Sequence, residues 1–132
     1  MAAPNECDLV KVFTKVPPRL VEQNHVPYNV GFNVAVQAEV GSALFQTEEA
    51  YQVIIVVRDL SASTTILPLT TISGNFGPPS WPTLDNTFMF AIPPQPPSME
   101  NHIIQAIAAL VIGTANSKVK FLESDLFIIT HP

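Results

Sequence analysis

The sequence has few charged residues, and its cations are scattered. Charged residues make up 13% of the chain, about half the share of roughly 25% in typical domains. Clustered lysines and arginines neutralise phosphates in nucleic-acid binding and attract anionic lipids, but the six present here form no cluster. We therefore expect neither nucleic acid nor membrane as a partner of this acidic chain. So little charge also indicates that part of the surface is covered by something.

Cysteine and long apolar runs are nearly absent as well. Cys7 is the single cysteine, so an intrachain disulfide is impossible. We expect a free thiol near a flexible terminus or, alternatively, an interchain bridge at an ordered arm formed by residues 1–8. The longest apolar run, Ile103 to Ile112, is far shorter than the roughly 20 residues of a membrane helix. No leader is visible in the first twenty residues, which predicts a soluble protein, cytoplasmic or exported without a leader, unless a leader was removed.

Glycine is scarce, with 5 residues, whereas proline is abundant, with 13. Proline lacks the N–H that a sheet ladder requires, so clusters such as Pro93-Pro94 and Pro96-Pro97 separate strands. These clusters break the chain too often for long helices. Because no repeat or linker divides the sequence, we expect one domain over residues 1–132.

Apolar and polar residues alternate between the prolines, which predicts strands. The clearest pattern runs from Tyr28 to Val40, where every second residue is apolar. The polar connection from Gly41 to Ala50 has room for one helical turn. The other expected strands are Leu9 to Val16, Tyr51 to Val57, the edge strand Thr64 to Thr71, Thr87 to Ile92, Ile103 to Ile112, and Val119 to Thr130.

The segment from Ile103 to Ile112 has two interpretations. Nearly all of its residues are apolar, and its alanines favour a helix that Ser98 would cap. We prefer a strand, because a helix would leave the last strand without the neighbour in sequence with which strands usually pair.

Seven strands with short connections predict an antiparallel two-sheet β-sandwich. The end of the chain resembles immunoglobulin-like and fibronectin type III domains: the strand Thr87 to Ile92, a proline turn, the strand Ile103 to Ile112, Gly113, and a last strand through Glu123 to Thr130. The sequence departs from that family because its only tryptophan, Trp81, lies in a loop. The resemblance implies a sandwich of this kind, and a jelly roll with the same elements is the alternative.

Some expected strands are apolar on both faces, although a solitary sandwich buries only one face of each sheet. The third, sixth and seventh strands, which share a sheet in such folds, have this property. The outward apolar positions of the third and sixth strands are Ile54, Val56, Ile103, Ile107 and Val111. Together they would exceed the patch of roughly 300–600 Å² that monomers expose. We expect an identical subunit, another protein, an apolar ligand, or an arm or loop of this chain to cover them.

The loop from Ser73 to Asp85 has the most unusual local composition, with Phe76 and Trp81 among glycines and prolines. Long loops are often functional, and these aromatic rings could stack on a sugar or anchor a partner. In the alternative interpretation, both rings fold back and close the open end of the sandwich.

Patterns typical of catalysis or metal binding are weak. The sequence has no G-x-S-x-G nucleophile motif. His25 and His102, with Glu22 or Glu100, form a conceivable zinc set, but we interpret them as solvated loop residues. We expect no catalytic residue, no metal and no cofactor.

These patterns predict a non-enzymatic structural or interaction module. It would self-associate, or bind another protein, through its apolar sheet face. The alternative is a carbohydrate- or small-ligand-binding module that uses the loop with Trp81, with a glycan as partner.

Overall fold

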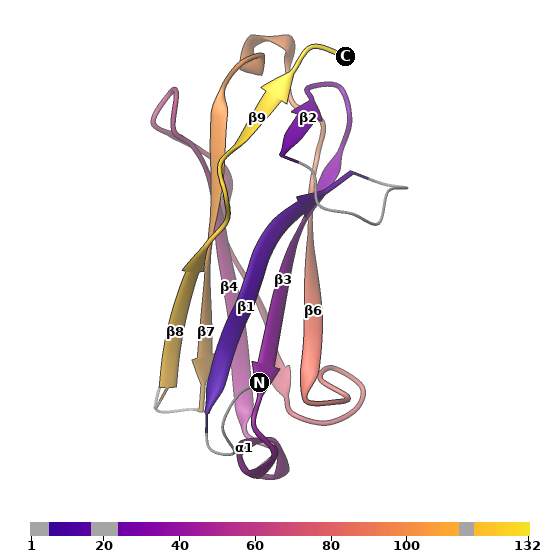
Figure 1. Ribbon diagram of the computed structural model, residues 1–132, viewed down its shortest axis with the longest axis vertical. Coiled ribbons are helices and arrows are strands. Elements are labelled where there is room, and N and C mark those ends of the chain that lie inside the picture. Colours follow the sequence, from indigo (N-terminus) through magenta and orange to yellow (C-terminus); the bar gives the residue numbers. More distant parts are fainter. Residues whose placement is uncertain (1–5, 17–23, 114–117) are drawn as a thin grey trace.

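The computed structural model describes residues 6–16, 24–113 and 118–132, which form an all-β sandwich of two packed sheets (Figure 1). The smaller sheet has the order β1-β3-β6, with β1 (Cys7–Lys15), β3 (Phe32–Val40) and β6 (Asp85–Ile92). The larger sheet has the order β2-β9-β7-β4-β5, with β8 beside β7. Its strands are β2 (His25–Pro27), β4 (Ala50–Asp59), β5 (Thr64–Asn75), β7 (Ile103–Ile112), β8 (Lys118–Glu123) and β9 (Phe127–Thr130). The predicted two-sheet sandwich is confirmed.

Helical structure is confined to short connections in the described parts of the chain. The single turn α1 (Ser42–Gln46) lies between β3 and β4, as the sequence predicts, and a 3-10 turn spans Pro97–Met99. Neither segment is long and apolar enough to cross a membrane. The segment from Ile103 to Ile112 is a strand, which confirms the preferred interpretation.

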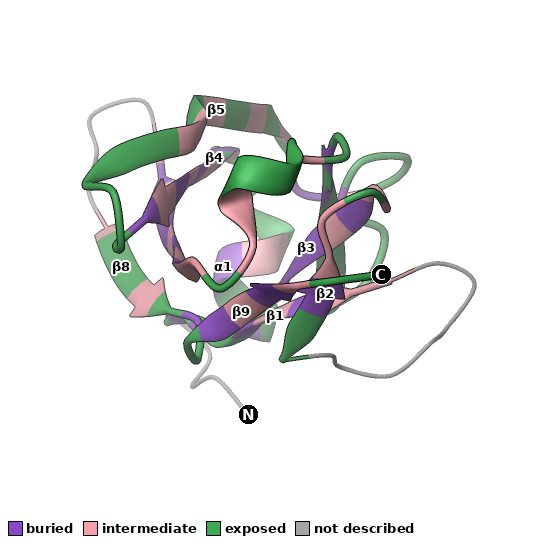
Figure 2. Cartoon of the chain, turned by 90° about the horizontal axis from the view of Figure 1, so that it is seen from above, coloured by how far each residue is buried: buried purple, intermediate pink, exposed green. Residues whose placement is uncertain are grey.

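The hydrophobic core lies between the two sheets and follows the alternation of the sequence. In β4, Tyr51, Val53, Ile55 and Val57 face inward and are buried, because successive side chains of a strand point to opposite faces. Figure 2 shows the buried residues between the sheets and exposed residues along β5 and β8. As expected, the third, sixth and seventh predicted strands share the larger sheet, and β5 forms its edge.

Two strand boundaries differ from the prediction by four residues, and one strand direction also differs. β3 begins at Phe32 rather than Tyr28, because the Val30 N–H donates to Pro27 O at 3.2 Å and turns the chain there. β5 continues beyond Thr71 to Asn75, which shortens the following loop. The short strand β2 pairs with β9 in parallel, so the larger sheet is not purely antiparallel.

The predicted final strand is interrupted, and Ser124 causes the interruption. The Ser124 N–H donates to Ala106 O at 2.8 Å, and its hydroxyl oxygen accepts the Ala106 N–H at 2.9 Å. Along β7, Ile107 pairs with Glu123 and Ile104 pairs with Phe127. Between these two pairs the chain advances by three residues on β7 but by four residues from Glu123 to Phe127. The extra residue forms a bulge. Because of this bulge, odd-numbered residues face outward in β8 but face the core in β9.

The first strand of the smaller sheet begins at Cys7, within the expected N-terminal arm. Cys7 opens β1 opposite Val40 and is only 1% exposed, so its thiol, which is free as expected, is buried in the sheet. Burial raises the pKa of the Cys7 thiol, although Lys120 and Lys118 act in the opposite direction. Of the expected arm, residues 7 and 8 lie in β1, and residues 1–5 lie outside the described residues.

Candidate functional site

The outer face of the larger sheet has an apolar centre that no described segment covers. Four of its strands contribute to this outer patch, which we define by its six side chains. They are Ile54 and Val56 of β4, Leu69 of β5, Ile107 and Ala109 of β7, and Phe121 of β8. The side chains of Leu69 and Phe121 project most strongly, with 71% and 72% of their surface exposed. Such exposure of large apolar side chains on one face is unfavourable in water.

The register of the strands brings these residues together. Ile54 lies opposite Ala109, which in turn lies opposite Phe121, so three apolar side chains form one row across β4, β7 and β8. Val56 lies opposite Ile107 in the next row. Because Ala109 is small, the surface sinks between the larger neighbours. The result is an apolar hollow of about 150 Å³, with Leu69 and Phe121 in its lining.

Polar residues border the patch on the same face. Arg58 lies opposite Gln105, and the Gln105 side chain donates to Glu123 Oε2 at 3.2 Å. The Arg58 Nε atom is buried and makes no hydrogen bond among the described residues. An apolar centre with a polar rim is the usual anatomy of a protein–protein interface.

The predicted surface residues all lie on this outer face, but only part of them lines the hollow. Ile54, Val56 and Ile107 are half-buried and form its floor. Val111 lies on β7 two residues beyond Ala109, opposite Val119 of β8. Ile103 lies at the other end of β7, opposite Ile128 of β9.

Sequence reasoning missed the two most exposed members of the patch, Leu69 and Phe121. Leu69 lies in a predicted edge strand whose faces the sequence does not distinguish. Phe121 and Phe127 are six residues apart, so an unbroken strand would place them on the same face. The bulge at Ser124 instead leaves Phe121 outside, while Phe127 is 3% exposed in the core.

The predicted ligand loop buries its aromatic rings. Trp81 has no exposed surface and Phe76 is 3% exposed. The Trp81 ring meets Tyr51 edge-on at 4.9 Å between centroids, and it meets Phe76 and Phe88 similarly at 5.0 and 5.4 Å. Both rings thus close the end of the sandwich, as in the second interpretation of the sequence, and neither has a free face on which a sugar could stack.

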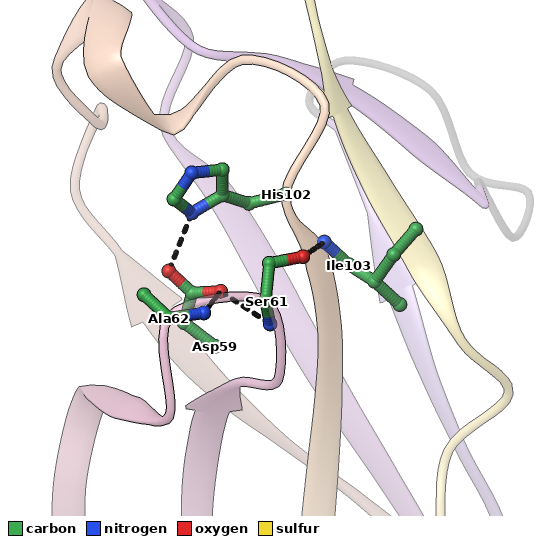
Figure 3. A network of polar contacts seen from close by, with 5 residues as sticks. All are labelled: Asp59, Ser61, Ala62, His102 and Ile103. Atoms are coloured by element: carbon green, nitrogen blue, oxygen red, sulfur yellow. Dashed lines mark hydrogen bonds and ion pairs between the residues drawn. The ribbon is translucent and has the colours of Figure 1, made fainter.

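A polar network holds the turn between β4 and β5 (Figure 3). The Asp59 carboxylate is fully buried, accepts the N–H groups of Ser61 and Ala62, and lies 2.7 Å from His102 Nδ1. The Ser61 hydroxyl oxygen accepts the Ile103 N–H at 2.9 Å. These bonds satisfy the buried carboxylate and tie the turn to the start of β7, so the network has a structural role.

The conceivable zinc set is not assembled in the described residues. His102 contacts Asp59, whereas Glu100 contacts His131 at 2.8 Å. His25 lies in β2, and Glu22 lies outside the described residues. No group of three potential metal ligands occurs in the part of the chain that the structure describes.

Comparison with known proteins gives no functional assignment. No family model matches the sequence, and neither does any curated protein. A solved structure described as a DUF4466 family protein from Parabacteroides merdae ATCC 43184 is similar to this chain, with a TM-score of 0.47 and 14% sequence identity. The similarity covers 92% of this chain and 44% of that chain, so this chain spans less than half of that protein's length.

Proposed function

We propose that this protein is a non-enzymatic interaction module that self-associates through the outer patch. The observation that carries the proposal is the combination of a hollow with two projecting apolar side chains, Leu69 and Phe121, on one sheet face. Burying such side chains away from water stabilises association, because the favourable free energy grows with the apolar area removed from water.

A second copy of the chain is the occupant that fits this face. In a two-fold dimer the same patch serves on both subunits, so a projecting side chain of one copy can enter the hollow of the other. The rim carries one cation, Arg58, and one anion, Glu123, so two copies can offer each other opposite charges.

The size of the hollow argues against a small-molecule site. Ligand pockets usually enclose about 300–1,000 Å³, whereas this hollow encloses about 150 Å³. It fits a single large side chain better than a ligand. The low share of charged residues in the chain, 13%, agrees with a surface that is partly covered in the assembled protein.

Solution mass, measured by light scattering over a range of concentrations, tests the proposal. Replacing Ile54 by lysine places a charge on the floor of the hollow, and we expect the contact through the outer patch to be lost and the solution mass to fall. Leu60→Lys adds the same charge at an exposed position in the turn between β4 and β5 and should leave the mass unchanged. Circular dichroism would establish that both variants are folded. An unchanged mass for a folded Ile54→Lys variant would overturn the proposal.

A further inference from the structure

The smaller sheet ends in an open strand edge at β6. β6 is the last strand in the order β1-β3-β6, and no described strand pairs with its outer side. Its eight residues pair with β3 without any shift in register, and they include no proline. Its single charged residue, Asp85, stands at the very start. A regular, uncharged edge of this kind is a template for pairing with another strand.

The sheet edges at β5, β1 and β2 are obstructed. β5 contains Pro68, and its pairing with β4 shifts twice. β1 has a register shift between Leu9 and Lys11 and lies against β8. β2 is three residues long and ends in Pro27. Prolines, bulges and short strands are the usual means of preventing edge pairing, so their absence from β6 sets this edge apart.

The direction of the free backbone groups follows from the ladder with β3. The Val40 N–H donates to Leu84 O at 2.9 Å, and hydrogen-bonded pairs alternate along an antiparallel ladder. The even-numbered residues from Asn86 to Ile92 therefore bond to β3. The odd-numbered residues from Asp85 to Ala91 point their N–H and C=O groups toward the open side.

Side chains cap only the first part of this edge. The Thr83 hydroxyl donates to Asp85 O at 3.0 Å, and Asn86 Oδ1 accepts the Thr87 N–H at 3.0 Å. The four central groups that follow are the C=O of Thr87, the N–H and C=O of Met89, and the N–H of Ala91, and the C=O of Ala91 stands at the end of the edge. No described side chain bonds to them.

These four groups are complementary to themselves about a two-fold axis at Met89. In an antiparallel pair of β6 strands centred there, each Met89 N–H meets the other Met89 C=O. Each Ala91 N–H likewise meets the other Thr87 C=O. The outward side chains that would lie side by side, Thr87, Met89 and Ala91, carry no charge that would repel its copy.

We propose that β6 pairs with β6 of a second copy, antiparallel and centred on Met89, so that the smaller sheets of two subunits become one continuous sheet. This contact is separate from the outer patch and does not depend on it. Where both operate, two different two-fold contacts link the subunits into assemblies larger than dimers.

Disulfide trapping tests the register directly. In a hydrogen-bonded antiparallel pair the facing Cα atoms are about 5.5 Å apart, which lies within the range for a disulfide. We expect Met89→Cys, in a Cys7→Ala background, to form an interchain disulfide at least ten times faster than Thr87→Cys in the same background. The two Thr87 residues would be about 14 Å apart at about 3.4 Å per residue. A mixture of Thr87→Cys and Ala91→Cys proteins should give the mixed dimer.

A second variant separates this contact from the outer patch. Met89→Pro removes an outward N–H and leaves the bonds to β3 in place, and Ile54→Lys disables the outer patch. The Ile54→Lys protein should remain a dimer that Met89→Pro converts to a monomer. Equal trapping rates for Met89→Cys and Thr87→Cys would overturn the β6 contact and leave the outer patch standing. Efficient trapping at Met89, with a mass that Ile54→Lys does not change, would overturn the outer patch instead.

Discussion

Replacing Phe121 by alanine should weaken self-association by roughly 30- to 700-fold while leaving the folded subunit almost as stable as before. Full burial of a phenylalanine side chain is worth about 1.5–3 kcal/mol. Because 72% of Phe121 remains exposed in the subunit, association can gain about 1–2 kcal/mol from each copy. A two-fold dimer contains two copies, and each 1.4 kcal/mol corresponds to a tenfold change in the dissociation constant.

The control is the phenylalanine six residues later. Phe127 is 3% exposed and meets Phe32 edge-on at 5.6 Å between ring centroids. Phe127→Ala should lower the free energy of unfolding by about 3–5 kcal/mol, whereas Phe121→Ala should lower it by no more than about 0.5 kcal/mol. Urea denaturation at low protein concentration measures this difference.

Sedimentation velocity over a concentration series measures the dissociation constants. A dissociation constant for Phe121→Ala equal to that of the wild-type chain would contradict a role of Phe121 in self-association. Unfolding of Phe121→Ala as easily as Phe127→Ala would also contradict it, because Phe121 would then belong to the core.

Three further results are expected from the described contacts. Trp81→Ala should lower the unfolding free energy by about 3–5 kcal/mol in urea titrations, since the ring is fully buried among Tyr51, Phe76 and Phe88; a change below 1 kcal/mol would contradict its role at the end of the sandwich. Ser124→Ala should cost about 1–3 kcal/mol in the same assay, because the buried Ala106 N–H loses its acceptor; a neutral effect would show that the hydroxyl does not maintain the bulge. The Cys7 thiol should react with a thiol reagent far more slowly in the native chain than in urea, because it is buried and its pKa is raised. The unfolded thiol ionises near its ordinary value of 9.0 while the buried thiol stays protonated, so this group should lower stability as the pH rises past that value; an equally steep loss in Cys7→Ala would rule this out.

Much of the fold follows from local patterns in the sequence. Alternation from Tyr28 to Val40 identified β3, although the strand begins only at Phe32, and proline clusters located the ends of several strands. The wholly apolar segment from Ile103 to Ile112 was harder, because its pattern fits a buried strand or a buried helix. The expectation that the last strand pairs with its neighbour in sequence favoured a strand over a helix, and the segment is a strand that pairs with β8.

The candidate surface was only partly predictable. Ile54, Val56 and Ile107 follow from counting alternate positions on two strands. Leu69 did not, because β5 is an edge strand whose register with β4 shifts twice, so parity along the sequence does not fix its face. Trp81 was ambiguous because a loop aromatic can point inward or outward, and the space beside Tyr51 that accepts it exists only in the folded chain.

Patterns along the sequence are enough to predict two sheets, one of which has more apolar residues than a single core face can use. Side-chain alternation and proline positions are local properties, so they can be read without the fold. The position of these additional apolar residues depends on the pairing of strands in the folded chain. The Ser124 hydroxyl accepts the Ala106 N–H at a bulge that holds one extra residue, so Phe121 lies on the outer face and Phe127 in the core. That outcome depends on a partner strand distant in sequence, and residue spacing alone does not encode it.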